Sequence, residues 1–506
     1  MNCLKFVYLI SALLAGSLSA ISQTVDYEAE AMGVVSSGDF APYYIASNRY
    51  GTLTQKNDAL LRLSAVMPMN IDKRFSYGFG VEALTGYTSE ADYARYNPET
   101  ANFYKNPQNP SSLQLQQLYA EIKFRGVFLT AGMKQREPGL LNFELSSGDL
   151  VESGNARPIP QVRAGFVDFQ DIPFTNGWVQ IQGELSYGKF ADNNWMKHHY
   201  NYYNYHINLG GLYTYKRVYF RTNTEKPLSV TVGMQSAGLF GGTTSTYRDG
   251  ERIREVKLKQ NLSAFFKMLV PHRESGSAYY DGNTLGSWDV MARYRLADGT
   301  ELKFYVQKPW EDGSGIGWMN GFDGIWGLEY KSPEPALLSG AVVEYLDFTN
   351  QSGPIHWSPD DSPGTTITSN ATGGDEYYNN FQTNSYMNYG MSIGTPFLPS
   401  PIYNLDGYPA FVHNRVRGFH AGFSGRIFPE LDYRLLGSYR KAWGDGRIPT
   451  SYSAHDTSMM LEAVYRVRKV SGLRLKCQLA FDSGNIYGDS FGVALSVSYN
   501  GNFSFK

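Results

Sequence analysis

Cysteine is almost absent from this chain of 506 residues, which contains only Cys3 and Cys477. Cys3 lies in a leader segment that we expect to be removed, so the mature protein keeps one cysteine and forms no internal disulfide bond. Cys477 alternates with polar residues on an otherwise apolar face, where we expect a buried and unreactive thiol.

Long apolar runs and an excess of one charge are lacking as well. Beyond the N-terminus no run is long and apolar enough for a membrane-spanning helix. The chain has 45 Lys and Arg against 47 Asp and Glu, a net charge of −2, which gives no support for a nucleic-acid partner. His-Glu-x-x-His, phosphate-loop, Cys-x-x-Cys and Gly-x-Ser-x-Gly motifs are missing. We therefore expect no catalytic residue, no metal and no cofactor, and predict that the protein is not an enzyme.

Two residue groups resemble sites only in composition. His198 and His199 are adjacent, and adjacent side chains of an extended chain point to opposite sides, which makes a poor metal site. Ser453, His455 and Asp456 suggest hydrolytic chemistry, but they crowd one predicted loop and lack a placed nucleophile. A solvated loop is the better interpretation of that group.

The first 22 residues have the pattern of a cleaved signal peptide. Lys5 gives a short basic start, residues 6–16 are apolar, and Ala20 and Ser22 supply small residues at the positions that a signal peptidase recognises. We predict removal of residues 1–22, export, and a mature chain of residues 23–506 that forms one domain.

The composition favours a large barrel over several soluble domains. Charged residues make up 18% of the chain, against about a quarter in typical domains, while aromatic residues reach 15% and the mean hydropathy is −0.36. A membrane barrel combines these properties because it places apolar side chains on lipid and polar ones in its lumen.

The strongest pattern is an alternation with a period of two near the C-terminus. Between Leu473 and Phe481, and again between Phe491 and Tyr499, apolar residues alternate with polar or small ones. Each run therefore predicts a strand with one apolar and one polar face. In a soluble sandwich, propeller or β-helix the apolar face would meet a core, whereas in an outer-membrane barrel it would meet lipid.

The lengths of the connections favour the barrel. Similar runs of about 10 residues, the length of a tilted membrane strand, recur near residues 75–83, 179–187, 288–296, 431–439 and 459–467. Short turns are predicted at residues 70–73, 124–126, 171–176, 297–299, 428–430 and 469–472, and long loops near 88–112, 190–205, 238–285, 350–413 and 443–456. We predict an all-β, transmembrane antiparallel barrel of about 18 strands, with 16 still possible, whose short turns are periplasmic and whose long loops are extracellular.

One loop segment has helical spacing. Leu258, Leu262, Phe265, Phe266 and Leu269 recur at intervals of three and four residues within 256–269. This spacing predicts one short amphipathic loop helix, which either folds against the barrel mouth or binds a partner.

Two loops are rich in aromatic rings next to amides and cations, a composition that suits sugars. A ring stacks on the apolar face of a pyranose while amides and charged groups bond to its hydroxyls. A packed loop cap would have the same composition. The candidate polysaccharide-binding residues are Trp195, His198, Tyr200, Tyr202, Tyr203 and Tyr205 in one loop and Tyr377, Tyr378, Asn379 and Asn380 in the other.

Five segments together resemble the capsule-assembly Wzi family. The first is residues 153–165, in which Ser-Gly-Asn-Ala-Arg-Pro-Ile-Pro at 153–160 is the most specific part and is followed by Gln-Val-Arg-Ala-Gly at 161–165; the others are 42–51, 377–380, 392–396 and 414–417. The resemblance covers essentially the whole mature chain. It implies an 18-stranded outer-membrane barrel with an occluded lumen. The resemblance also implies that the barrel acts as a lectin, holding capsular or related polysaccharide at the cell surface, and does no catalysis. Some members carry a helical segment ahead of the barrel, but here strand-like residues begin almost at Gln23, which leaves little room for one.

Two functions stay open. The first is a polysaccharide-binding anchor that uses the loop aromatics and Arg157, unless Arg157 only pairs within its own proline-stiffened loop; the second is a diffusion channel for oligosaccharides. Inward-facing residues of both signs, such as Arg434 and Glu462, suit a lumen closed by ion pairs. The expected partners are surface or capsular polysaccharide and outer-membrane lipid, with a monomeric barrel.

Overall fold

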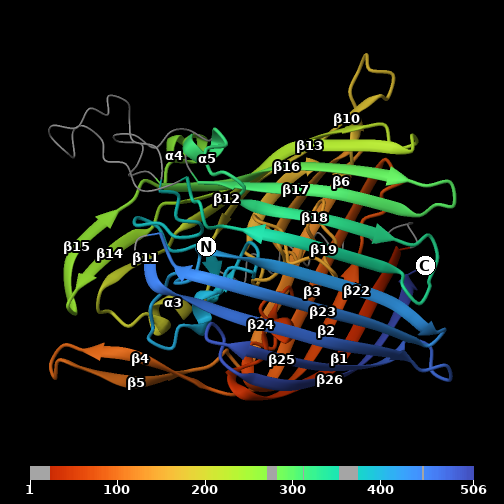
Figure 1. Ribbon diagram of the computed structural model, residues 1–506. Helices are drawn as coiled ribbons and strands as arrows, with labels where there is room; N and C mark the ends of the chain where they lie inside the picture. Colours follow the sequence, from red (N-terminus) through yellow and green to blue (C-terminus); the bar gives the residue numbers. More distant parts are fainter. Residues whose placement is uncertain (1–22, 270–281, 312, 353–373, 447–448, 506) are drawn as a thin grey trace.

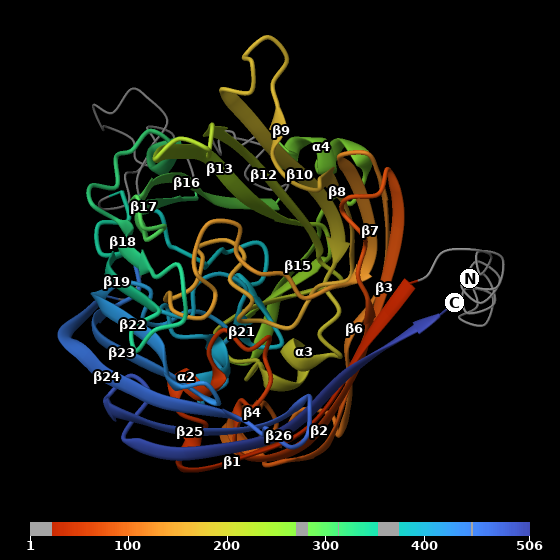
Figure 2. The ribbon, with the colours of Figure 1, turned by 90° about the vertical axis from the view of Figure 1, so that its right-hand side faces the viewer.

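The computed structural model describes residues 23–311, 313–352, 374–446 and 449–505, except for 270–281. The predicted signal peptide, residues 1–22, lies outside the described residues. The fold is a closed antiparallel β-barrel of the outer-membrane type (Figures 1 and 2). Its sheet has 19 strands, of which β8 and the two-residue β9 both pair with β10 and share one position, so the barrel has 18 strand positions.

The barrel strands follow one another in chain order and the sheet closes on itself. The first strand pairs with the last from Gln23↔Phe505 to Ser36↔Gly492. Closure leaves no strand edge unpaired, which lipid would not tolerate. The strands are β1 (Gln23–Phe40), β2 (Gln55–Met67), β3 (Phe75–Thr88), β6 (Leu113–Phe124), β7 (Val127–Met133), β8 (Gln161–Phe166), β9 (Gln170–Asp171), β10 (Val179–Lys189), β12 (Leu212–Thr222), β13 (Leu228–Phe240), β16 (Gly282–Arg295), β17 (Glu301–Trp310), β18 (Gly324–Lys331), β19 (Gly340–Asp347), β22 (Val416–Phe428), β23 (Leu431–Gly444), β24 (Pro449–Arg466), β25 (Leu473–Gly484) and β26 (Ser490–Phe505).

The two ends of the barrel differ, as predicted. One end carries the short connections and is here called the turn end; the other carries the long connections and is called the loop end (Figure 1). Both described termini lie at the turn end, where Gln23 pairs with Phe505. All six predicted short turns lie at the turn end, together with two more at residues 223–227 and 332–339.

One loop prediction is wrong. Residues 443–456 do not form a long loop, because β24 begins at Pro449 and continues the pairing with β23, so that only residues 445–448 connect the two strands. His455 and Asp456 therefore lie on opposite faces of a strand, His455 exposed and Asp456 buried. They form no hydrolytic group.

The wall has the predicted faces. In the C-terminal hairpin Leu479 and Leu495 point outward and are 41% and 58% exposed, whereas Gln478 and Ala494 point into the lumen and are 1% and 4% exposed. This apolar exterior suits lipid. Cys477 is free, as expected, but only partly buried, because it lies on the outer face.

Smaller elements lie at the loop end or in connections that fold from it into the lumen. They include the hairpin β4 (Ala91–Asn97) with β5 (Asn102–Gln108), the sheet of β11 (Tyr205–Leu209), β14 (Thr243–Arg248) and β15 (Glu251–Lys257), the pair β20 (Met387–Asn388) with β21 (Met391–Ser392), and the helical segments α2 (Tyr43–Ala46), α3 (Trp195–His199), α4 (Leu262–Leu269), α5 (Gly313–Ile316) and η2 (Pro401–Tyr403). The predicted loop helix exists as α4, but its first residues belong to β15. In the part of the chain that the structure describes, no helix is long and apolar enough to cross a membrane.

Three connections fold inward and fill the central part of the lumen (Figure 2). We call residues 41–54, 134–160 and 374–415 the plug. The five segments that carry the family resemblance lie in or next to it and bond to one another. Asn155 donates to the Ser392 carbonyl at 3.0 Å, Ser153 donates to the Gly394 carbonyl at 2.7 Å, and Asn414 donates to the Tyr377 carbonyl at 3.0 Å.

Glycine permits the closest approach within the plug. A Cβ atom on Gly394 would lie 2.2 Å from the Tyr378 hydroxyl and 2.3 Å from the Leu150 carbonyl. These two groups bond to each other at 2.6 Å, so Gly394 lets one plug segment cross another at a hydrogen bond.

Ion pairs line the lumen around the plug, as the mixed inward charges predicted. Arg163 contacts Glu184 and Glu152, each at 2.7 Å, and Arg434 contacts Glu462 at 3.0 Å. Pairing of this kind offsets part of the cost of burying these charges.

Candidate functional site

A cavity of about 250 Å³ lies at the loop end, above the plug. We call it the mouth pocket. Distant parts of the chain build it: the start of β2, the β4–β5 hairpin, the start of β6, the α3 segment and all three plug segments. Its lining includes Tyr93, Asn109, Gln114, Arg157, Asn193, Trp195, His198, His199 and Tyr389. Three of the predicted binding residues, Arg157, Trp195 and His198, are thus brought together.

Helix α3 fixes the tryptophan of this pocket. Asp192 accepts the backbone N–H groups of Asn194 and Met196 at 3.1 and 3.0 Å, which holds the first turn of the helix. The Trp195 ring stacks on the His199 ring with centroids 4.2 Å apart and planes at 18°. A Cβ on Gly390 would lie 2.3 Å from the Trp195 ring, so this position accepts only glycine next to the indole.

Arg157 is held from three sides. Its guanidinium lies 4.1 Å from the centroid of the Tyr389 ring and donates to the Gln116 side chain at 3.1 Å and the Leu115 carbonyl at 3.2 Å. Gly51, at φ +65°, allows the chain to pass here, since a Cβ would lie 2.8 Å from the Arg157 side chain. Arg157 thus has structural partners and also lines the pocket, so it combines features of the two roles considered from the sequence, pairing within the protein and binding polysaccharide.

Burial sets the charges of the pocket. It lowers the pKa of His199 from 6.5 to about 3, so this imidazole is neutral near pH 7, and it also lowers the pKa of Arg157. His199 lies between the Trp195 and Tyr93 rings, 4.4 Å from the centroid of the latter. His198 points to solvent instead, and its carbonyl accepts the Asn106 side chain at 2.9 Å. The adjacent histidines thus have different environments, but they lie in helix α3 and not on the extended chain that the sequence analysis assumed.

The four tyrosines that follow α3 lie outside the mouth pocket. Tyr200 is fully buried. The Arg95 guanidinium lies 4.9 Å from the centroid of the Tyr202 ring, and the Tyr203 and Tyr96 rings pack with centroids 4.8 Å apart. Tyr205 stacks on His206 at 4.3 Å. Tyr202, Tyr203 and Tyr205 are partly exposed at the loop end.

Residues 377–380 serve the plug. Tyr377 donates to Asp323 at 2.8 Å, Tyr378 donates to the Leu150 carbonyl, and Asn379 donates to the Phe411 carbonyl at 3.0 Å. The Asn380 side chain accepts the backbone N–H groups of residues 382 and 383. Tyr377, Tyr378 and Asn379 are at most 5% exposed. Internal hydrogen bonds therefore occupy the polar groups that we expected to bind a sugar.

Sequence reasoning missed Tyr93, Tyr389, Asn109 and Gln114. Tyr389 lies in a stretch whose aromatic content was noted, but the other three come from the β4–β5 region and β6, where no local pattern sets them apart. Within the described residues, no group of three or more His, Cys, Asp and Glu could hold a metal ion.

No protein-family model matches the chain, and no curated protein sequence matches it. Solved structures do. Wzi, an outer-membrane protein involved in group 1 capsule assembly in Escherichia coli and a carbohydrate-binding β-barrel, is 13% identical, with a TM-score of 0.54 over 97% of this chain and 87% of that chain. Acinetobacter baumannii OccAB2 is 10% identical, with a TM-score of 0.48 over 97% of this chain and 100% of that chain. OprD from Pseudomonas aeruginosa is 10% identical, with a TM-score of 0.46 over 95% and 94%. At these identities the comparison with Wzi establishes the fold alone, an outer-membrane β-barrel.

Proposed function

We propose that this protein is a non-catalytic, lectin-like barrel of the outer membrane that binds surface or capsular polysaccharide in the mouth pocket and anchors it at the cell surface. The observation that carries the proposal is the pocket itself, which gathers Trp195, Arg157 and His198 at the loop end. In this proposal the loop end faces the exterior and the turn end faces the periplasm, after removal of a signal peptide.

The pocket has the chemistry that a sugar needs. An indole offers an apolar surface for the C–H face of a pyranose, and the loss of entropy on binding is small because the ring is already packed. Asn109 and Asn193 donate their side-chain amides within the loops, at 3.2 and 2.9 Å, which leaves their carbonyl oxygens to accept from hydroxyls. Arg157 adds a cation for acidic or hydroxyl groups.

We also infer that the chain is a distant member of the Wzi family. The motifs that carry the resemblance form the plug contacts, and the fold is shared with a barrel described as carbohydrate-binding. This membership supports a role in capsule assembly.

A diffusion channel for oligosaccharides is the competing proposal, and the plug counts against it. Purified protein reconstituted in planar lipid bilayers is expected to give no large, steady single-channel current, because the plug fills the central lumen. Large steady currents would refute the anchor proposal.

Binding is tested with Trp195→Ala and polysaccharide purified from the producing cell. We expect at least a tenfold loss of affinity in calorimetry, about 1.4 kcal/mol or more, as for a buried aromatic contact. The matched control is Trp178→Ala, an indole 61% exposed near the turn end. The variant Tyr202→Ala/Tyr203→Ala shows whether the outer tyrosines extend the site. Equal affinity of the Trp195 variant and wild type would refute the assignment of the pocket.

The anchor role has its own test in cells. Deleting the gene is expected to release polysaccharide from the cell surface into the medium, and the Trp195→Ala protein should restore retention only in part. Unchanged retention after deletion, with no binding of purified glycan, would overturn the proposal.

A further inference from the structure

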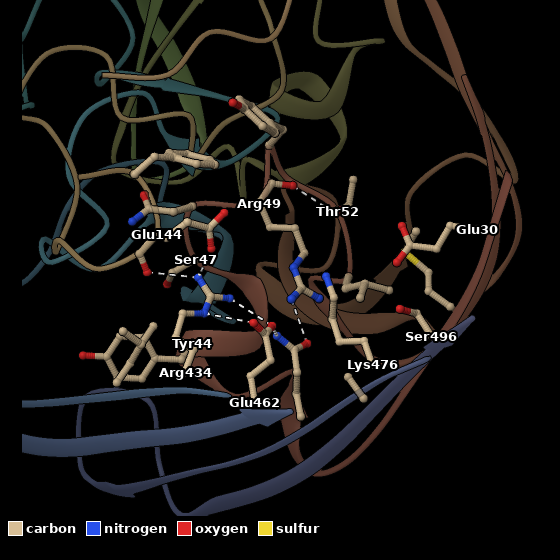
Figure 3. Close-up of a pocket in the computed structure, with 18 of the residues that line it drawn as sticks. Glu30, Tyr44, Ser47, Arg49, Thr52, Glu144, Arg434, Glu462, Lys476 and Ser496 are labelled. Atoms are coloured by element: carbon tan, nitrogen blue, oxygen red, sulfur yellow. Dashed lines mark hydrogen bonds and ion pairs between the residues drawn. The ribbon is translucent and has the colours of Figure 1, made fainter. Parts of the chain in front are cut away.

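A second cavity, of about 220 Å³, lies on the opposite side of the plug (Figure 3). We call it the lower cavity. Its roof is the plug segment that carries Tyr44, Ser47 and Arg49, and its wall is formed by β1 to β3 and β23 to β26. Arg434 and Lys476 are each the fourth residue from the turn end of their strands. The Glu144 side chain at its edge is 65% exposed, so water reaches this cavity.

The wall carboxylates of this cavity already have cations. Glu462 accepts two hydrogen bonds from Arg434, at 3.1 and 3.0 Å, and a third from Gln478 at 2.6 Å. Arg62 contacts both Glu30 and Glu82, at 2.7 and 3.6 Å. The direct contacts of these carboxylates are thus with Arg434 and Arg62, while Glu462 and Glu30 attract Arg49 and Lys476 only at longer range.

Two cations, Arg49 and Lys476, lie between these two groups of ion pairs. Arg49 donates to the neutral Gln478 amide at 2.7 Å, and Lys476 projects beside the Arg49 guanidinium in Figure 3. Among the residues that the structure describes, neither cation has a carboxylate within ion-pair distance, and the Lys476 ammonium has no hydrogen bond. Two like charges side by side in a partly buried site repel each other, and a bound anion would remove that repulsion.

The same cavity offers contacts for a sugar ring. Tyr50 and Phe143 lie together with ring centroids 5.5 Å apart. The hydroxyls of Ser47 and Thr52 donate to backbone carbonyls at 2.6 and 2.9 Å, which leaves their oxygens as acceptors on the cavity wall. Aromatic surface and hydroxyl groups next to paired cations suit a hydroxylated ring that carries a carboxylate.

We propose that the lower cavity is a second ligand site, which takes a sugar acid from the turn end, with its carboxylate between Arg49 and Lys476. The site is separate from the mouth pocket, because the plug lies between the two cavities and they share no lining residue. Its ligand is a single small sugar acid, in keeping with its volume.

Calorimetry on the full-length barrel in detergent, with D-glucuronate as the probe, tests this proposal. We expect binding that weakens with added salt, is at least tenfold weaker for D-glucose, which lacks the carboxylate, and is weaker for acetate, which lacks the ring. Arg49→Gln and Lys476→Gln should each lower the affinity for glucuronate at least tenfold. Equal binding of glucose and glucuronate, or no binding of glucuronate, would overturn the proposal.

Two controls keep the result interpretable. Arg295→Gln removes another cation near the turn end, 44% exposed, while Arg293 still contacts the shared Glu301 at 3.3 Å. This variant should bind glucuronate as wild type does; an equal loss would show a general charge effect and overturn the assignment. The losses caused by Arg49→Gln and Lys476→Gln should persist in a Trp195→Ala background, which removes any contribution from glucuronate bound at the mouth pocket, so failure at the mouth pocket and failure here are distinguishable. Circular dichroism confirms that each variant is folded.

Discussion

Removing the Asn155 side chain should release the plug without opening the barrel wall. Asn155 is fully buried, donates to the Ser392 carbonyl at 3.0 Å and accepts the Asn48 backbone N–H at 3.0 Å. These two bonds tie residues 134–160 to both other plug segments. Asn155→Ala leaves a buried carbonyl without its partner, at about 1–3 kcal/mol, and a partly buried N–H without its partner, at about 1 kcal/mol, so the plug should lose about 2–4 kcal/mol.

Hydrogen exchange followed by mass spectrometry measures this loss locally. The lower limit of about 2 kcal/mol corresponds to about 30-fold faster exchange through plug opening. The increase is expected in peptides that cover residues 41–54, 140–157 and 386–400, while strand peptides such as 473–484 stay protected. The matched control is Asn223→Ala, which removes one bond, to the Glu225 N–H at 2.8 Å, in a turn at the turn end. Unchanged exchange in all three plug segments would refute the idea that these bonds hold the plug.

Two further predictions concern the mouth pocket. Because burial lowers the pKa of His199 from 6.5 to about 3, the unfolded chain binds more protons between these values, so stability is complete above pH 6.5 and falls as the pH drops towards 3. At pH 5 the stability lost is about 2 kcal/mol, which should appear as faster hydrogen exchange of the α3 amides. His199→Gln should abolish this pH dependence. Equal exchange of the wild-type α3 amides at pH 7 and pH 5, after correction for the intrinsic rates, would contradict the prediction. Gly390→Ala should push the Trp195 ring aside and weaken glycan binding, whereas Gly210→Ala, with a similar φ of +82° and nothing within 4 Å, carries the same backbone cost without the collision. Equal affinities of these two glycine variants would show that the position of the indole does not matter.

The wall was predictable because each strand repeats one simple rule. Because one face of each strand meets lipid and the other meets the lumen, apolar and polar residues alternate with a period of two. Leu479 on the outer face and Gln478 in the lumen are an example. The rule fails where a strand extends beyond the lipid. Ser451 and His455 in β24 lie at the loop end, are exposed and are polar, so this segment had the composition of a loop.

The plug and the mouth pocket were predictable only in part. The α3 segment was recognised because Trp195 and His198 are close in sequence, and Arg157 because it lies in the most specific motif. Tyr93 and Gln114 reach the same pocket from the β4–β5 hairpin and β6, and only the closed barrel brings them there. Residues 377–380 illustrate the reverse, because the same rings and amides that suit a sugar also satisfy one another in a buried plug.

The plug segment 134–160 links the plug contacts to the mouth pocket. Asn155 ties this segment to the other two plug segments, and two residues later Arg157 lines the pocket. The Arg157 carbonyl accepts the Asn388 side chain at 2.8 Å. Tyr389, the ring beneath Arg157, follows Asn388 directly. Loss of the plug bonds should therefore disturb Arg157 and Tyr389 together, whereas Trp195, held by Asp192 and α3, should keep its place. A glycan whose affinity falls in both Asn155→Ala and Trp195→Ala must use both walls of the pocket, and one that responds only to Trp195→Ala is bound by the α3 side alone.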